Sequence, residues 1–132
     1  TRVLRGNAFK LNQYEYWHGR EVGWNKTPLT EFMSETAVMW NTGQGQVVYS
    51  KHYATYIFVH AAGNQVYMRT APKPEGPWTA DVLAYSPTLL EANGYAYAAV
   101  AHPYLDSTGK TLTISYTNSP NVIQVIKVNF TQ

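Results

Sequence analysis

Three polar residues lie in strand-like sequence, where each could point toward a ligand. His102 lies in "VAHPYLD", His60 ends "YIFVH", and Arg69 lies in "YMRTA". The proline after His102 holds that histidine in extended backbone geometry. A histidine in such a place could bind a metal, transfer a proton or donate a hydrogen bond to a ligand, or it could be a satisfied structural histidine. For Arg69, bidentate hydrogen bonding that ties two elements together is favoured over contact with a ligand.

An aromatic group, Tyr14, Tyr16, Trp17 and Trp24, surrounds the glycine-rich turn of "YEYWHGREVGW". Tyrosine is unusually frequent, at 11 of 132 residues, and four tryptophans accompany it. Both residue types favour pleated, half-buried surfaces, and their rings stack on the faces of ligands such as sugars. The group therefore predicts either a sugar subsite or a packed interface, and packing is the favoured alternative.

Charge and motifs argue against several other classes of protein. The net charge is only +2, and Lys and Arg are scattered singly, so the clustered basic face that nucleic acids or acidic membranes require is missing. The chain has no cysteine, P-loop, G-x-S-x-G, G-x-G-x-x-G, H-E-x-x-H or EF-hand motif, so no cofactor and no metal site are expected. Two N-x-[ST] sequons, at Asn25 and Asn129, favour a secreted glycoprotein. No signal peptide, membrane-spanning run or initiator methionine precedes the strand-like sequence at Thr1, so the chain is expected to be processed, cleaved or truncated.

Apolar residues alternate with period two along nearly the whole chain, which is typical of β-strands. A helix of one or two turns is allowed only within "PLTEFMSETAVMW", residues 28–40. The pattern predicts an all-β sandwich, barrel or propeller, in a single domain over residues 1–132. The expected strands are Thr1–Leu4, Asn12–Trp17, Ala37–Trp40, Gln46–Ser50, Thr55–His60, Gln65–Thr70, Val82–Ser86, Ala96–His102, Thr111–Tyr116 and Val122–Asn129.

An internal repeat favours the propeller. Residues 47–78 and 97–130 follow the same order of strands and turns, at an offset of about 55 residues, which is near the length of a propeller blade. The chain then holds roughly two and a half to three four-stranded blades, with the turn "PKPEGPW" at the corner of one. Because a propeller closes with about four to eight blades, a second polypeptide is expected to supply the others.

Four segments carry a resemblance to a known family: "YEYWHGREVGW" (14–24), "GQGQVVYSKHYATYIFVHA" (43–61), "VYMRTAPKPEGPWT" (66–79) and "YAAVAHPYLDSTGKTLTISYT" (97–117). Together they resemble the last blades of five-bladed propellers in carbohydrate-active proteins, and in particular the family called domain of unknown function 4185. Its relatives share the architecture of glycoside hydrolase families 43 and 62, and some members are endo-D-arabinanases. The resemblance implies the C-terminal blades of a secreted, glycan-acting propeller.

Catalysis by such a propeller would need two carboxyl groups flanking the scissile bond. Glu35 and Glu15 are the candidates in this chain, since Glu75, Asp81 and Asp106 fall in turn sequence. Where a carboxylate is expected before the inner strand of a blade, "GQGQVVYS" has Gln46, which cannot act as an acid or a base. At least one catalytic carboxylate is therefore expected from the partner chain. The predicted catalytic residues are Glu35 and His102, and the predicted sugar-binding residues are Tyr14, Tyr16, Trp17, Trp24, Arg69 and His60. The alternative is a non-catalytic lectin or toxin-like binding protein. A pocket lined by aromatic rings, without a pair of carboxylates, would favour this alternative.

Overall fold

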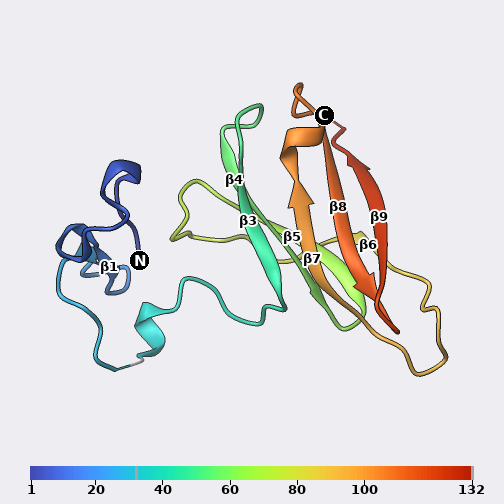
Figure 1. Ribbon diagram of the computed structural model, residues 1–132, viewed down its shortest axis with the longest axis horizontal. Helices are drawn as coiled ribbons and strands as arrows, with labels where there is room; N and C mark the ends of the chain where they lie inside the picture. Colours follow the sequence, from blue (N-terminus) through green and yellow to red (C-terminus); the bar gives the residue numbers. More distant parts are fainter. Residues whose placement is uncertain (32, 132) are drawn as a thin grey trace. The chain divides into compact units, whose positions relative to one another are not determined.

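The computed structural model describes residues 1–31 and 33–131, and its fold is all-β (Figure 1). The described residues form three antiparallel sheets, of two, four and three strands. They also form short 3-10 helices but no α-helix. The chain divides into two compact units, Thr1–Trp40 and Asn41–Gln132. Within the described residues, no helix is both long and apolar enough to cross a membrane.

The first unit has little regular structure. Its elements are the 3-10 helices η1 (Arg5–Asn7), η2 (Leu11–Gln13) and η3 (Ser34–Thr36) and the strands β1 (Tyr16–Trp17) and β2 (Trp24–Asn25), which pair with each other. The short helix allowed within residues 28–40 is η3, while residue 32 lies outside the described residues.

The strand predictions for this unit are largely wrong. Thr1–Leu4 contributes only a bridge between Arg2 and Glu15, and Ala37–Trp40 forms no strand in the described part of the chain. Asn12 and Gln13 of the predicted strand Asn12–Trp17 belong to η2 instead, because the Gln13 N–H donates to the carbonyl of Lys10 and closes a local turn.

The second unit begins with a four-stranded sheet in the order β3-β4-β5-β6. Its strands are β3 (Gly45–Ser50), β4 (Thr55–Ala62), β5 (Gln65–Ala71) and β6 (Val82–Tyr85). A tight hairpin joins β4 to β5 through Gly63 and Asn64, both at positive φ, as a two-residue turn of the right twist requires. Between β5 and β6, the predicted "PKPEGPW" corner places Trp78 beside Phe58, with ring centroids 6.1 Å apart.

A three-stranded sheet in the order β7-β8-β9 follows. Its strands are β7 (Ala96–His102), β8 (Thr111–Asn118) and β9 (Val122–Asn129), and the 3-10 helix η4 (Pro103–Leu105) follows β7. The sequence predicted the bounds of β7 and β9 correctly, and the order of β7, β8 and β9 repeats that of β3, β4 and β5. Among the described residues, one sheet has four strands, where the repeat predicted between two and three such sheets.

The core of the second unit lies between its two sheets. Val59, Val66, Ala99 and Ile114 are fully buried there, and β7 packs against β3 and β4. Small side chains on β7 let the backbones approach, so that the backbone N–H of Ala101 donates to Oε1 of Gln46 at 3.0 Å. The two sheets therefore form one packed body that can hold a surface site in place.

Candidate functional site

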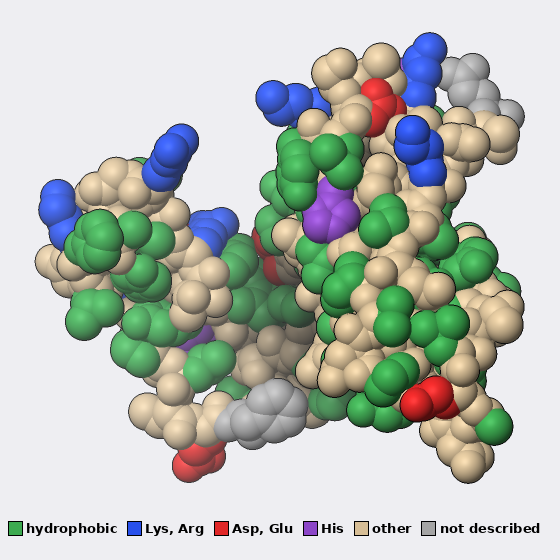
Figure 2. All heavy atoms as spheres, turned by 45° about the vertical axis from the view of Figure 1, so that its right-hand side comes forward, with side chains coloured by type: hydrophobic (Ala, Val, Ile, Leu, Met, Phe, Trp, Pro, Cys, Tyr) green, Lys and Arg blue, Asp and Glu red, His purple; other side chains and the backbone are tan. Residues whose placement is uncertain are grey.

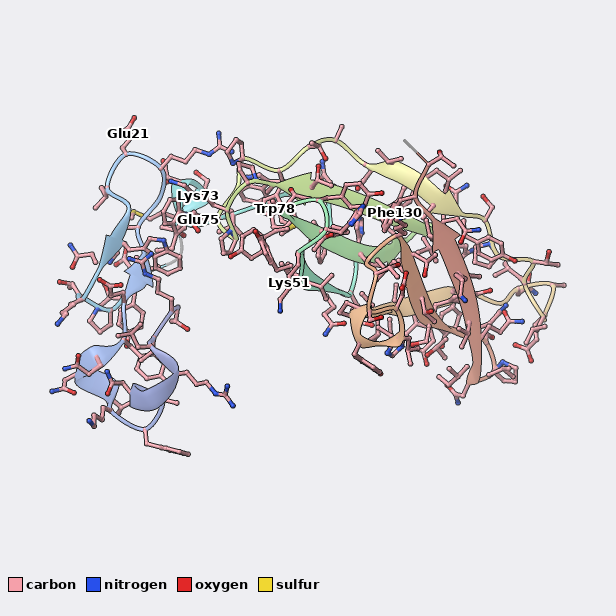
Figure 3. The ribbon with its side chains drawn as sticks, turned by 90° about the horizontal axis from the view of Figure 1, so that it is seen from above. Glu21, Lys51, Lys73, Glu75, Trp78 and Phe130 are labelled. Atoms are coloured by element: carbon pink, nitrogen blue, oxygen red, sulfur yellow. The ribbon has the colours of Figure 1, made fainter. Side chains whose placement is uncertain are left out.

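A cleft with a volume of about 570 Å³ lies between the β3–β4 turn and the segment from η4 to β8. Lys51 extends from the β3–β4 turn away from the sheet at this cleft (Figure 3). The lining residues are Val48, Tyr49, Ser50, Lys51, His52, Ile57, Pro103, Tyr104, Asp106, Ser107, Thr108, Gly109, Thr111, Leu112 and Phe130.

Exposed aromatic rings are the main feature of the cleft. Tyr104 is 76% exposed and Tyr49 is 48% exposed, although both belong to ordered elements. Tyr53 contacts two of the lining residues, with its ring centroid 5.4 Å from that of Phe130 and 4.6 Å from that of His52. Rings held at a surface in this way present an apolar face together with a polar edge, which suits an amphipathic ligand.

Asp106 is the one carboxylate among the described residues that line the cleft, and its oxygens are already occupied. Oδ1 accepts hydrogen bonds from the backbone N–H and the hydroxyl of Thr108, at 2.8 and 2.7 Å. Oδ2 accepts from the same two groups of Thr111, both at 2.8 Å. These bonds hold the pKa of Asp106 well below its usual range, so this carboxyl group fixes a turn and is a poor proton donor near neutral pH.

His102, predicted as a catalytic residue, lies at the end of β7 beside the cleft. Its Nδ1 is 2.8 Å from the hydroxyl of Tyr104, and its Nε2 is 2.8 Å from Oγ of Ser115. The imidazole thus connects the sheet to the exposed ring of Tyr104. Glu35, the other predicted catalytic residue, is exposed in η3 of the first unit, whereas His102 belongs to the second unit.

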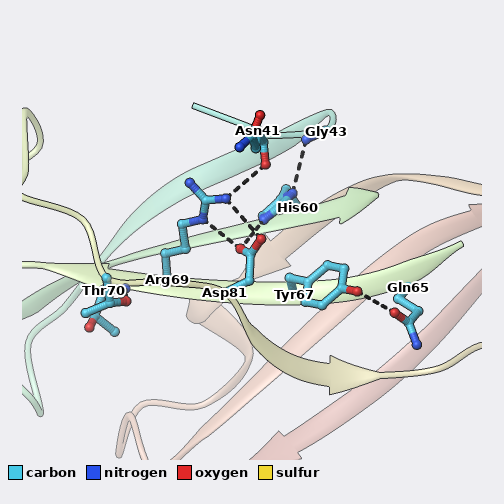
Figure 4. A network of polar contacts seen from close by, with 9 residues as sticks. Asn41, Gly43, His60, Gln65, Tyr67, Arg69, Thr70 and Asp81 are labelled. Carbon is cyan, nitrogen blue, oxygen red and sulfur yellow. Dashed lines mark hydrogen bonds and ion pairs between the residues drawn. The ribbon is translucent and has the colours of Figure 1, made fainter. Parts of the chain in front are cut away.

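A separate polar network involves Arg69 and His60 (Figure 4). Asp81 joins them, since its Oδ1 accepts from Nε of Arg69 at 2.6 Å and lies 2.8 Å from Nε2 of His60. Nη2 of Arg69 donates to Oδ2 of Asp81 at 3.0 Å and to the carbonyl of Asn41 at 2.9 Å. The backbone N–H of Gly43 donates to Nδ1 of His60 at 3.1 Å, which places the ring hydrogen on Nε2, facing the carboxylate.

This network ties four segments together. His60 is on β4, Arg69 is on β5, Asp81 directly precedes β6, and the segment with Asn41 and Gly43 precedes β3. The Arg69 guanidinium, helped by His60, lowers the pKa of Asp81 from 3.8 to about 2 and is itself held protonated, with a raised pKa. His60 is fully buried, and both of its nitrogens are used, so no part of it is open to a sugar. Arg69 is likewise buried, which agrees with the structural alternative for this residue.

The aromatic group of the first unit is packed against its own neighbours. The rings of Trp17 and Trp24 lie 5.5 Å apart, and the guanidinium of Arg2 lies 4.5 Å above the ring of Trp24. Nε of Arg2 also donates to Glu15 at 2.7 Å. Tyr14 donates its hydroxyl to the carbonyl of Ala8 at 2.7 Å. These contacts support the packing alternative for this group and give Glu15 a partner.

Both sequon asparagines, Asn25 and Asn129, are exposed, and Oδ1 of Asn25 accepts from the backbone N–H of Thr27 at 2.8 Å. The described residues hold no group of three or more His, Cys, Asp or Glu that could bind a metal ion.

Sequence reasoning missed the residues that form the cleft. Tyr49, Lys51, His52 and Tyr104 flank turns, where isolated residues show no periodicity. The usable signal was the repeat itself, because it aligns the ends of β3 and β7 and so brings the segments after them to one side of the unit.

No curated protein matches this sequence. The model of one protein family, described as "Domain of unknown function (DUF4185)", matches residues 1–125. The chain belongs to the DUF4185 family.

Proposed function

We propose that this chain is part of a secreted β-propeller that binds carbohydrate at the cleft between the β3–β4 turn and the segment from η4 to β8. The observation that carries the proposal is the lining of the cleft: exposed Tyr49 and Tyr104, several hydroxyl groups, Lys51, and a single carboxylate whose oxygens are already hydrogen-bonded.

The chemistry of this lining fits a sugar. Sugar rings have apolar C–H faces that stack on aromatic rings, and hydroxyl groups that exchange hydrogen bonds with Ser, Thr and Lys. Ser50, Ser107 and Thr108 line the same cleft as the two tyrosines. Its volume of about 570 Å³ lies within the range of small-molecule sites, which corresponds to a short oligosaccharide segment.

The arrangement of the two larger sheets supports the propeller. They repeat the same strand order, and β7 packs against β3 and β4, as the first strands of neighbouring blades do around an axis. In this proposal, residues outside 1–132 supply the remaining blades. The two exposed sequons support secretion of a glycoprotein.

The second candidate function is hydrolysis of a polysaccharide, in the first place one that contains arabinose. The family resemblance supports this candidate. It requires two free carboxyl groups about 5–10 Å apart. Because Asp106 is committed to a turn, an enzyme built around this cleft would need carboxylates from outside its described lining.

The test combines a glycan array with an assay of reducing-sugar release from arabinans. We expect binding without release, and a loss of about tenfold in affinity for Tyr104→Ala and for Tyr49→Ala, which corresponds to about 1.4 kcal/mol for an aromatic contact. Tyr95→Ala is the matched control, because Tyr95 is also an exposed tyrosine, at 56%, and does not line the cleft. Release of sugar would favour the hydrolase, and neither binding nor release would refute both proposals.

A further inference from the structure

The β7–β9 sheet has a second broad face, directed away from the core. Strand register defines it: Val100 pairs with Ser115, and Ser115 pairs with Val125 on the other side. Val125 is 62% exposed, and its neighbour on the same face, Ile123, is 65% exposed. We refer to this set as the outer face; it comprises Val100, His102, Thr113, Ser115, Thr117, Ile123, Val125 and Lys127. Thr113 and Thr117 are buried, so Val100, Ile123 and Val125 form its exposed apolar part.

Figure 2 turns this side of the molecule forward. Hydrophobic side chains are spread over the middle of the larger unit in this view, and the charged ones lie toward its two ends. An exposed surface of this composition is typical of an interaction site, because aliphatic side chains gain free energy when another surface removes them from water.

The repeat shows what covers the equivalent face of the first sheet. Register aligns β8 with β4 and β9 with β5, so Ile123 and Val125 correspond to Val66 and Met68. Val66 is fully buried and Met68 packs against the same core, where both are covered by the β7–β9 sheet. The structure therefore contains one filled copy of this interface and one open copy.

The edge of the sheet is open as well. In the first sheet, β6 pairs with β5. Among the described residues β9 pairs only with β8, so the position equivalent to β6 is vacant. An exposed edge of eight residues offers a row of backbone donors and acceptors to another strand.

We propose that the outer face docks a further antiparallel sheet, contributed by residues outside this chain, whose leading strand carries small side chains. At the filled interface Ala99 and Ala101 of β7 have this role, and their size permits the close approach of β7 to β3 and β4. A second copy of the chain cannot supply such a surface, because its own Ala99 and Ala101 are at most 2% exposed within its core. The inference rests on the proposed propeller and names the surface through which its next blade is added.

The direct test is photo-crosslinking from position 123 in the native particle that contains this chain. We expect the crosslinked peptide to come from outside residues 1–132 and to be a strand with small residues at alternate positions. Crosslinks within residues 1–132, crosslinks between two copies, or no crosslinks at all would overturn the inference.

A variant pair tests the same surface by assembly. Ile123→Lys with Val125→Lys should reduce incorporation of the chain into the particle at least tenfold, while the isolated chain keeps its far-UV circular dichroism and its glycan affinity. Leu83→Lys is the control, since Leu83 is similarly exposed, at 52%, but lies on β6. Normal incorporation of the double variant would refute the inference.

The two proposals fail in different ways. A particle that forms a closed ring through another surface would retain the propeller and remove this inference. A particle with a sheet docked on Ile123 but stacked in an open array would retain the inference and remove the propeller.

Discussion

At the scale of single residues, the carboxylate of Asp81 connects several segments of the second unit, although the sequence indicated only that Asp81 lies in a turn. Asp81 stands between Arg69 and His60, and its side chain is 30% exposed while the side chain of His60 is fully buried. The sequence favoured a structural role for Arg69, but its partner lies 12 residues further along the chain. Such pairings depend on the path of the β5–β6 connection, which no local pattern encodes.

Asp81→Asn should lower the free energy of unfolding by about 2 kcal/mol, the typical value of a hydrogen bond to a charged group. The amide oxygen can still accept from His60, but the amide nitrogen would face Nη2 of Arg69, leaving a buried cation without its anion. Urea unfolding measures the effect. Glu75→Gln is the control, because it removes a carboxylate from the same connection and leaves these contacts in place. Equal stability of the two variants would contradict the prediction.

The ion pair of Asp81 and Arg69 predicts that the free energy of unfolding depends on pH. Because the pKa of Asp81 is lowered from 3.8 to about 2 on folding, its contribution is complete above its ordinary pKa and is lost as the pH falls toward the folded value. The difference in unfolding free energy between the natural chain and Asp81→Asn should therefore be constant near pH 5 and should shrink between about pH 4 and pH 2. Urea titrations of both proteins across this range measure the difference. A difference that stays constant down to pH 2 would show that the pair is not formed.

At the scale of elements, the sequence predicted strands well where alternation coincides with long-range pairing. β7 and β9 have the predicted bounds, because each lies between turn residues and pairs with β8, β9 along its whole length and β7 with one irregularity between Tyr97 and Val100. Prediction failed in the first unit, where "NQYEYW" alternates in the same way but begins in the 3-10 turn of η2. The cleft was not predictable for a related reason: its rings come from two turns that only the packing of the sheets brings together.

The segment before β3 passes close to the backbone of β4 at Gly43. In the sequence, the only sign of this close approach is the glycine itself. A Cβ at Gly43 would lie 1.7 Å from the carbonyl oxygen of Ala61, so Gly43→Ala must displace the segment that donates to His60. We expect a loss of about 2–3 kcal/mol, the range of overpacked positions, measured by thermal or urea unfolding. Gly63→Ala meets no atom within 4 Å and pays only for its positive φ, about 1 kcal/mol. Equal effects at the two glycines would show that the approach at Gly43 is not tight.

At the scale of the whole molecule, the outer face and the free edge of β9 determine how the isolated chain behaves in solution. Ile123 and Val125 remain in contact with water unless another sheet covers them, and within the described residues no strand pairs with the outer edge of β9 beside them. We therefore expect the chain of 132 residues to elute from a size-exclusion column as associated species larger than its 14.9 kDa monomer, in a concentration-dependent manner. Ile123→Lys with Val125→Lys should shift it toward the monomer, because two charges oppose both face and edge contacts, whereas Leu83→Lys should not. A soluble monomer that unfolds cooperatively without these substitutions would show that the two sheets are self-sufficient, and would count against both the partner chain and the incomplete propeller.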